Sequence, residues 1–215
     1  MGTWNVQGLG DKDNYKVVEA WTKKVGKHAK ILALEEMKAG EENVSRNIAN
    51  LFPEARCIVD YTVSDRGGAA LIVYKTHKIL ESGIKGDGTA AWATIEIEDG
   101  QLGVMSVHGP QNDREKANFF NWLRAFEHEG QWILLGDWTM VTELEDSVGP
   151  TPMIHGHLAR KWRGISQAWD LVDAFQVAGK REGPFFTRQA LVRTSKGDPM
   201  DQSRLDRVYI NINTH

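Results

Sequence analysis

The chain has 215 residues, of which 41% are hydrophobic and 26% are charged. This is the composition and length of one folded globular domain, and it excludes intrinsic disorder. The single cysteine, Cys57, excludes a disulfide framework and a zinc site built from several cysteines. The apolar runs are too short to span a bilayer and no apolar leader follows Met1, so we expect an intracellular protein, nuclear or cytoplasmic, without membrane contact.

The net charge of −3 is unevenly distributed along the sequence. Residues 1–150 hold 16 Lys or Arg and 23 Asp or Glu, whereas residues 151–215 hold 10 and 6. A basic C-terminal third is compatible with a surface that faces phosphate groups, for which Arg160–Arg163 and Gly179–Arg181 are the candidates. The alternative is an ordinary solvated face with scattered charge.

Short apolar segments rich in β-branched or aromatic residues predict strands. They are residues 3–6, 31–34, 69–74, 92–97, 102–108, 132–136 and 205–212. Asp99 and Gly100 separate two of these segments and predict a hairpin, so we expect antiparallel pairing in the sheets.

Apolar spacing of three and four residues predicts three helices. One runs from about Asn14, and the second begins with Asp113 as its N-cap. The apolar faces of the three helices are formed by Val17, Val18, Trp21 and Val25, by Phe119, Phe120, Leu123 and Phe126, and by Trp162, Ile165, Trp169 and Val172. The alternation of helices and strands with a hairpin favours an α/β fold of two mixed sheets flanked by helices over a doubly wound parallel sheet. Most of the eight tryptophans fall at core positions, which indicates packing rather than base stacking.

Several predicted strands end on a polar residue that a metal or a phosphate group can use. These residues are Asn5, Glu36, His108 and Asp137, and Asp206 lies at the start of the last strand. Because strand ends at one edge of a sheet meet in space, carboxylates, an amide and an imidazole can converge there on a hard divalent cation and a phosphate. The alternative for each residue alone is that the strand has reached the surface.

Five motifs in this order resemble those of the endonuclease/exonuclease/phosphatase superfamily. They are Thr3-Trp-Asn-Val-Gln-Gly-Leu9, Leu34-Glu-Glu-Met37, Val107-His-Gly-Pro-Gln111, Leu135-Gly-Asp-Trp-Thr139 and Ser203-Arg-Leu-Asp-Arg207. Two further segments, Trp169-Asp-Leu-Val-Asp173 and Gly183-Pro-Phe-Phe-Thr187, resemble the endonuclease domain of plant-type non-LTR (LINE-like) retrotransposons.

The resemblance implies one DNase I-like domain over residues 1–215, a four-layer α/β sandwich that hydrolyses phosphodiester bonds of DNA with Mg²⁺ or Mn²⁺. It implies that Glu36 is the metal ligand and that Asp137 orients or deprotonates the attacking water. Asn5 would help to hold the metal or phosphate shell, and Asp206 would orient the catalytic histidine. These roles agree with the chemistry of metal-assisted hydrolysis.

The sequence departs from the family pattern at three site positions. Gln7 stands where many members carry Asp, His108 replaces a tyrosine that contacts phosphate, and Thr139 replaces an asparagine. The chain also ends nine residues after Asp206, before the Ser-Asp-His motif of the family, so we expect a domain that is incomplete at its C-terminal strand. Three hypotheses stay open: a DNA endonuclease of retrotransposon type, an inactive relic that at most binds nucleic acid or a partner, and a phosphoesterase for a small substrate. The oligomeric state is not predicted.

Overall fold

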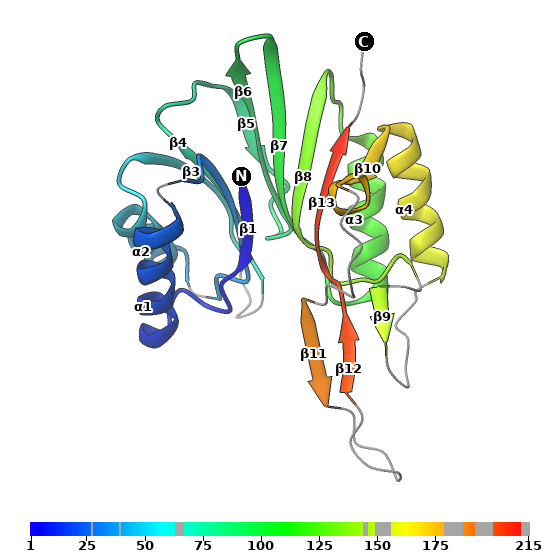
Figure 1. The fold of residues 1–215 in the computed structure, drawn as a ribbon, viewed down its shortest axis with the longest axis horizontal. Coiled ribbons are helices and arrows are strands. Elements are labelled where there is room, and N and C mark those ends of the chain that lie inside the picture. Colours follow the sequence, from blue (N-terminus) through cyan, green and yellow to red (C-terminus); the bar gives the residue numbers. More distant parts are fainter. Residues whose placement is uncertain are drawn as a thin grey trace. The chain divides into compact units, whose positions relative to one another are not determined.

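The computed structural model, shown in Figure 1, describes residues 1–26, 28–38, 40–62, 67–143, 146–148, 156–178, 187–191 and 200–211. The chain forms two compact units. The first unit comprises Met1–His108 and Glu129–Asp137, and the second comprises Gly109–His128 and Trp138–His215. Among the helices of the described residues, none is both long and apolar enough to cross a membrane.

The first sheet of the first unit has the strand order β1-β2-β4-β3. β1 pairs with β2 in parallel, and β4 pairs antiparallel with both β2 and β3. Two helices, coloured blue in Figure 1, lie beside this sheet and share one apolar core with it. The elements are β1 (Gly2–Asn5), α1 (Lys12–Trp21), a π-helical turn (Thr22–Gly26), β2 (Ile31–Glu35), α2 (Glu41–Leu51), β3 (Ala55–Asp60) and β4 (Ala69–Tyr74).

Each helix packs on this sheet through one apolar face. In α1, Asp11 is the N-cap and accepts hydrogen bonds from the backbone N–H groups of Asp13 and Asn14. Val18 of α1 is buried, but 58% of Val17 is exposed, so the predicted face that included both residues is wrong at Val17. Successive helical side chains point about 100° apart, and only one of two neighbours can face the sheet squarely.

The second sheet of the first unit runs β5-β6-β7-β8. β5, β6 and β7 are antiparallel, and β7 and β8 are parallel. The hairpin predicted at Asp99 and Gly100 is confirmed as the connection between β6 and β7. This sheet faces the first one, with β2 contacting both β7 and β8. The strands are β5 (Ile79–Ile84), β6 (Ala90–Ile97), β7 (Gly100–His108) and β8 (Gln131–Asp137).

The second unit combines two longer helices with short strands. α3 and α4 pack side by side, and the Phe120 and Trp162 rings lie 6.0 Å apart between centroids. β10 pairs antiparallel with β13, and β11, β12 and β9 form a small antiparallel sheet. The elements are α3 (Asp113–Ala125), β9 (Ser147–Val148), α4 (Gly156–Ala168), β10 (Leu171–Asp173), α5 (Ala174–Val177), β11 (Arg188–Leu191), β12 (Met200–Ser203) and β13 (Asp206–Asn211).

Two helix predictions in this unit need correction. Asn112, rather than Asp113, is the N-cap of α3, and its side chain accepts the N–H of Glu115. α4 ends at Ala168, so Trp169 lies beyond the helix and Val172 belongs to β10. The chain leaves the helical path at Asp170, whose φ of 51° is left-handed. Trp169 is nevertheless buried, as the core interpretation of the tryptophans predicted.

Candidate metal centre

Three of the predicted site residues come together in the first unit. Glu36 directly follows β2, and His108 and Asp137 are the last residues of the neighbouring parallel strands β7 and β8, where they are register partners. Each of the three offers one ligand atom, and these atoms lie within 4.8 Å of one another. One imidazole nitrogen and two carboxylates at this spacing form a donor set that suits a divalent cation.

Gly136 allows this strand end to form. Its φ is 144°, and a Cβ at this position would lie only 1.9 Å from the carbonyl oxygen of Val107 and 3.0 Å from Oε1 of Glu35. Any side chain here would therefore push β8 away from β7 and from β2. A glycine directly before Asp137 is thus a steric requirement of bringing that carboxylate beside His108.

Asn5 joins the two carboxylates of the cluster. Its Oδ1 accepts the backbone N–H of Gln7 at 3.1 Å, so its Nδ2 faces the cluster. Nδ2 donates to Oδ2 of Asp137 at 3.1 Å, and the Asn5 side chain also hydrogen-bonds Glu36. Asn5 therefore lies beside the cluster, as predicted. Its side-chain amide donates hydrogen bonds that hold the two carboxylates in place.

The charges around Glu36 keep it ionised. Burial would raise the pKa of Glu36, but hydrogen bonds from Lys38 and Asn5 and the charge of Lys38 outweigh burial and lower the pKa below its usual value. Nζ of Lys38 lies 2.5 Å from Oε2 of Glu36, and Nε2 of His108 lies 3.9 Å from Oε1. Lys38 was not singled out from the sequence, although it follows Glu36 by two positions.

His108 is prepared to act as a ligand. Burial lowers the pKa of its imidazole, Lys38 lowers it further, and Glu36 only partly opposes these effects, so the ring is neutral at pH 7. Its Nε2 is buried and accepts or donates no hydrogen bond within the described part of the chain. A buried, unpaired imidazole nitrogen facing a carboxylate fits a divalent metal ion, which would use that lone pair.

A loop between the two sheets holds the ligand-bearing segments in place. The backbone N–H of Glu36 donates to the carbonyl of Gly68 at 3.1 Å, and the N–H of Gly68 donates to that of Gly88 at 3.2 Å. The N–H of His108 donates to the carbonyl of Thr89 at 2.9 Å. Residues 86–89 therefore contact the strand end that carries His108 directly, and they support Glu36 through Gly68.

Asp60, the last residue of β3, anchors this loop. It is fully buried, and its carboxylate accepts the backbone N–H groups of Gly86, Thr89 and Ala90, each at 3.1 Å. Burial raises the pKa of Asp60, and these backbone donors oppose the rise. This role of Asp60 is not visible in the sequence, because its partners are backbone groups almost thirty residues away.

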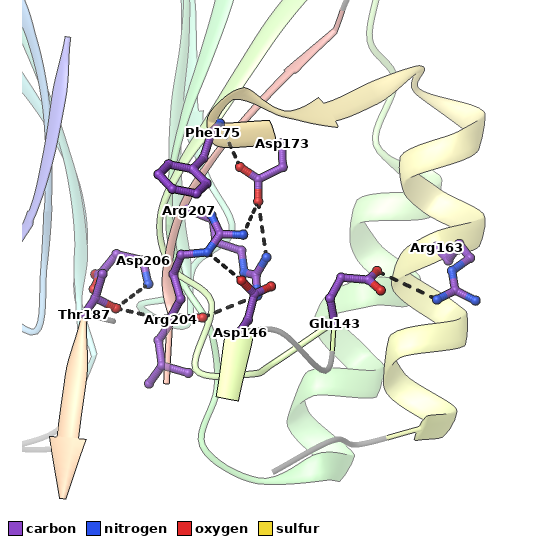
Figure 2. A network of polar contacts seen from close by, with 10 residues as sticks. Glu143, Asp146, Arg163, Asp173, Phe175, Thr187, Arg204, Asp206 and Arg207 are labelled. Carbon is purple, nitrogen blue, oxygen red and sulfur yellow. Dashed lines mark hydrogen bonds and ion pairs between the residues drawn. The ribbon is translucent and has the colours of Figure 1, made fainter. Parts of the chain in front are cut away.

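Thr139 and Asp206 belong to the second unit. The Thr139 hydroxyl lies 3.0 Å from the carbonyl oxygen of Gly109 and 2.7 Å from that of Pro110, so it donates within the fold. Its φ of 48° is left-handed, which is unusual for a β-branched residue. Asp206 begins β13 as predicted, and its backbone N–H donates to Oγ1 of Thr187 at 3.1 Å (Figure 2).

The second unit also contains a buried network of two arginines and two aspartates (Figure 2). Arg204 contacts Asp146 at 2.9 Å and Asp173 at 2.6 Å, and Arg207 contacts the same two carboxylates at 2.8 and 3.2 Å. Asp173 is also the N-cap of α5, and the Arg204 guanidinium lies 5.0 Å from the centre of the Phe175 ring. Both arginines are buried, so two positive charges of the basic C-terminal third are used inside the fold.

The other basic candidates have different positions. Arg160, Lys161 and Arg163 are exposed on α4, and Arg163 lies 3.8 Å from Glu143. Residues 179–181 and the 183–186 part of the Gly183–Thr187 segment lie outside the described residues.

Comparison with known proteins identifies the fold. No family model matches the sequence. A search of curated proteins also finds no match. Among solved structures, the APE2 catalytic domain of Xenopus laevis superposes with a TM-score of 0.72 at 16% identity, covering 98% of this chain and 81% of that one.

Two AP endonucleases give similar superpositions. The enzyme from Archaeoglobus fulgidus has a TM-score of 0.71 at 15% identity, over 97% of this chain and 85% of that chain. LMAP from Leishmania major has a TM-score of 0.72 at 14% identity, over 98% and 78%. The predicted fold class is therefore confirmed: the chain has the mixed α/β fold of these proteins, with two main mixed sheets and helices, over nearly its whole length.

Proposed function

We propose that this chain is a divalent-metal-dependent phosphodiesterase that cleaves DNA. The observation that carries the proposal is the Glu36–His108–Asp137 cluster, in which ligand atoms from three strand ends lie within 4.8 Å of one another and the buried imidazole nitrogen is unpaired among the described residues. The fold shared with AP endonucleases supports the same chemistry.

In this proposal Glu36 and His108 would hold Mg²⁺ or Mn²⁺, which would supply positive charge against the phosphate and make the attacking water more acidic. Asp137 accepts a proton from the attacking water, and Asn5 orients its carboxylate through Nδ2. The neutral state of His108 and the ionised state of Glu36 at pH 7 are the protonation states that this arrangement requires. We propose that Asp206 orients a further catalytic group, as in the family that the motifs resemble.

We further propose that the substrate is intact DNA, nicked by an endonuclease of retrotransposon type. The segments Trp169–Asp173 and Gly183–Thr187, which resemble the endonuclease domain of plant-type non-LTR retrotransposons, support this assignment.

The experiment is a nicking assay on supercoiled plasmid with Mg²⁺ or Mn²⁺. We expect wild type and the matched control Lys78→Met, which removes an exposed ion pair with Glu96, to nick the plasmid equally. Asp137→Asn removes the proposed base and should lower the rate by about 10²–10⁴-fold. Glu36→Gln should lower it by a similar factor, and EDTA should abolish it. Equal nicking by wild type and Glu36→Gln would contradict the proposal.

Thr139 favours a second candidate, a fold that binds DNA without turnover. Its hydroxyl is engaged by the carbonyl groups of Gly109 and Pro110, so it does not offer the free donor that an asparagine side chain would supply. Salt-dependent DNA binding without nicking would support this candidate. Cleavage of a duplex with one abasic site, or of bis(p-nitrophenyl) phosphate, with no cleavage of intact DNA would instead identify an abasic-site or small-substrate phosphodiesterase.

A further inference from the structure

Lys38 places a positive charge directly on the carboxylate at the centre of the candidate metal site. Its Nζ lies 2.5 Å from Oε2 of Glu36, and the exposed fractions of the two side chains are 36% and 17%. The other oxygen, Oε1, faces Nε2 of His108 at 3.9 Å. One of the two oxygens that Glu36 can offer to a cation is therefore already occupied by an ammonium group.

The backbone directs Lys38 toward this position. Its φ is 42°, and its N–H donates to the carbonyl of Gly67 at 3.4 Å. Glu36, with a φ of 55°, is bonded in the same way to Gly68. Glu36 and Lys38 are two positions apart, and the Lys38 ammonium group reaches the Glu36 carboxylate on the same side of the loop.

An ammonium ion and a divalent ion at the same carboxylate weaken each other's binding. The protonated lysine has no lone pair to offer as a ligand, and its charge repels a nearby cation. However, the Lys38 side chain is partly exposed, so its flexible stem can carry the ammonium into solvent without breaking the backbone contacts that hold Glu36.

We propose that Lys38 is an internal counter-ion that competes with the divalent metal for Glu36 and thereby lowers the metal affinity of the site. The inference rests on the proposed function, since it takes the Glu36–His108–Asp137 cluster as the metal site. Without the metal, the Lys38 ammonium group pairs with the Glu36 carboxylate, and metal binding displaces that ammonium group from Oε2.

The test is calorimetric titration of the intact chain with Mn²⁺ alone, without DNA. Lys38→Met removes the charge and keeps the length of the side chain, and Lys38→Gln is a second neutral variant. We expect both to bind Mn²⁺ about tenfold more tightly than wild type, because a like charge is removed from beside a partly buried cation site. Lys38→Arg, which keeps the charge, and the control Lys78→Met should stay within about twofold of wild type.

The outcomes separate this inference from the proposed function. If the neutral Lys38 variants bind Mn²⁺ no more tightly than wild type, while Glu36→Gln abolishes binding, the competition is wrong and the metal site stands. If Glu36→Gln binds as wild type does, or if neither wild type nor the neutral variants bind Mn²⁺, both proposals are overturned. Thermal melts of the metal-free variants identify any that do not fold, and Lys38→Gln then replaces Lys38→Met.

Discussion

Each unit of the molecule contains a pair of partly or wholly buried carboxylates, but the two pairs are balanced differently. In the second unit, Asp146 and Asp173 face two guanidinium groups, each of which contacts both carboxylates. In the first unit, Glu36 pairs with the Lys38 ammonium group, and Glu36 and Asp137 both lie close to an imidazole that is neutral at pH 7. In the second group each carboxylate therefore faces two cations, whereas the first group contains a buried imidazole nitrogen without a hydrogen-bond partner among the described residues.

This difference distinguishes a structural ion network from a site arranged for a ligand. Buried charges are tolerated when they contact opposite charges within the fold, and removing one partner then leaves the others buried and unpaired. A buried imidazole nitrogen without a hydrogen-bond partner is costly to the free protein, and a cation bound there would offset that cost. The motifs Trp169–Asp173 and Ser203–Arg207 thus have a demonstrated structural contact, while the strand ends of the first unit have the chemistry of a metal site.

The largest expected effect on stability comes from removing one carboxylate from each group. Asp173→Asn takes away the shared partner of Arg204 and Arg207 and should lower the free energy of unfolding by about 3–5 kcal/mol. Glu36→Gln removes one partly exposed ion pair, that with Lys38, and should change the free energy of unfolding by less than about 1 kcal/mol. Urea unfolding measures both changes.

The matched control for this pair is Asp170→Asn, the same chemical change at an exposed position three residues before Asp173. Asparagine tolerates the left-handed backbone of Asp170, so its stability should equal that of wild type. A loss for Glu36→Gln as large as that for Asp173→Asn would show that the first cluster is also a structural network.

The lowered pKa of Asp146 in the second unit makes stability depend on acid pH. Burial would raise the pKa of Asp146, but the hydrogen bonds and charges of Arg204 and Arg207 outweigh it and hold the pKa below its usual value. A carboxyl group with a lowered folded-state pKa stabilises the fold above its unfolded-state pKa of about 3.9, and this contribution is lost as the pH falls through the folded-state value. The difference in unfolding free energy between wild type and Asp146→Asn should therefore be constant at neutral pH and shrink below about pH 4. Urea titrations across this range measure it, and a difference that persists at the lowest pH would contradict the assignment.

The smallest expected effect concerns backbone strain at Gln7, close to the Glu36–His108–Asp137 cluster. Gln7 is exposed, with a φ of 52°, and its contacts with Asn5 and Asn14 use only its backbone. Gln7→Gly relieves the left-handed conformation at the cost of a more flexible unfolded chain, for a net gain of about 0.5 kcal/mol. Asp170→Gly, at a residue type that tolerates this conformation, should gain nothing. Differential scanning calorimetry measures the melting temperatures of the two variants. A lower melting temperature for Gln7→Gly than for Asp170→Gly would contradict the claim that the backbone of Gln7 is strained.

The strands that carry the candidate site were predictable because each is an apolar run that ends at a polar residue. Other elements lacked such a signal. β3 contains Arg56, and β5 is half-exposed, so neither alternates clearly. α2, in contrast, was detectable, since Val44, Ile48 and Leu51 are spaced as on one helical face and all are buried.

Within the site, the residues predicted from strand ends came together, and those that depend on loop geometry were missed. Asn5, Glu36, His108 and Asp137 are in the cluster because two pairs of parallel strands, β1–β2 and β7–β8, end beside each other although they belong to different sheets. Lys38 meets Glu36 in a loop in which both residues are left-handed, a conformation that the residue types Glu and Lys do not indicate. The basic C-terminal third suggested a phosphate-facing surface, but the two buried arginines in it required aspartates that the sequence did not connect with them.

The Asp60 carboxylate has a consequence for the choice of ion. Through its bonds to residues 86–90, it fixes the backbone that binds His108 directly and Glu36 through Gly68, although it contacts neither side chain in the described hydrogen bonds. Mg²⁺ requires ligands at about 2.0–2.1 Å, whereas Ca²⁺ accepts about 2.3–2.6 Å. If Glu36 and His108 hold the ion as proposed, an insertion or deletion in this loop would change the separation of these two residues and thereby the size of the preferred ion, with both ligands unchanged.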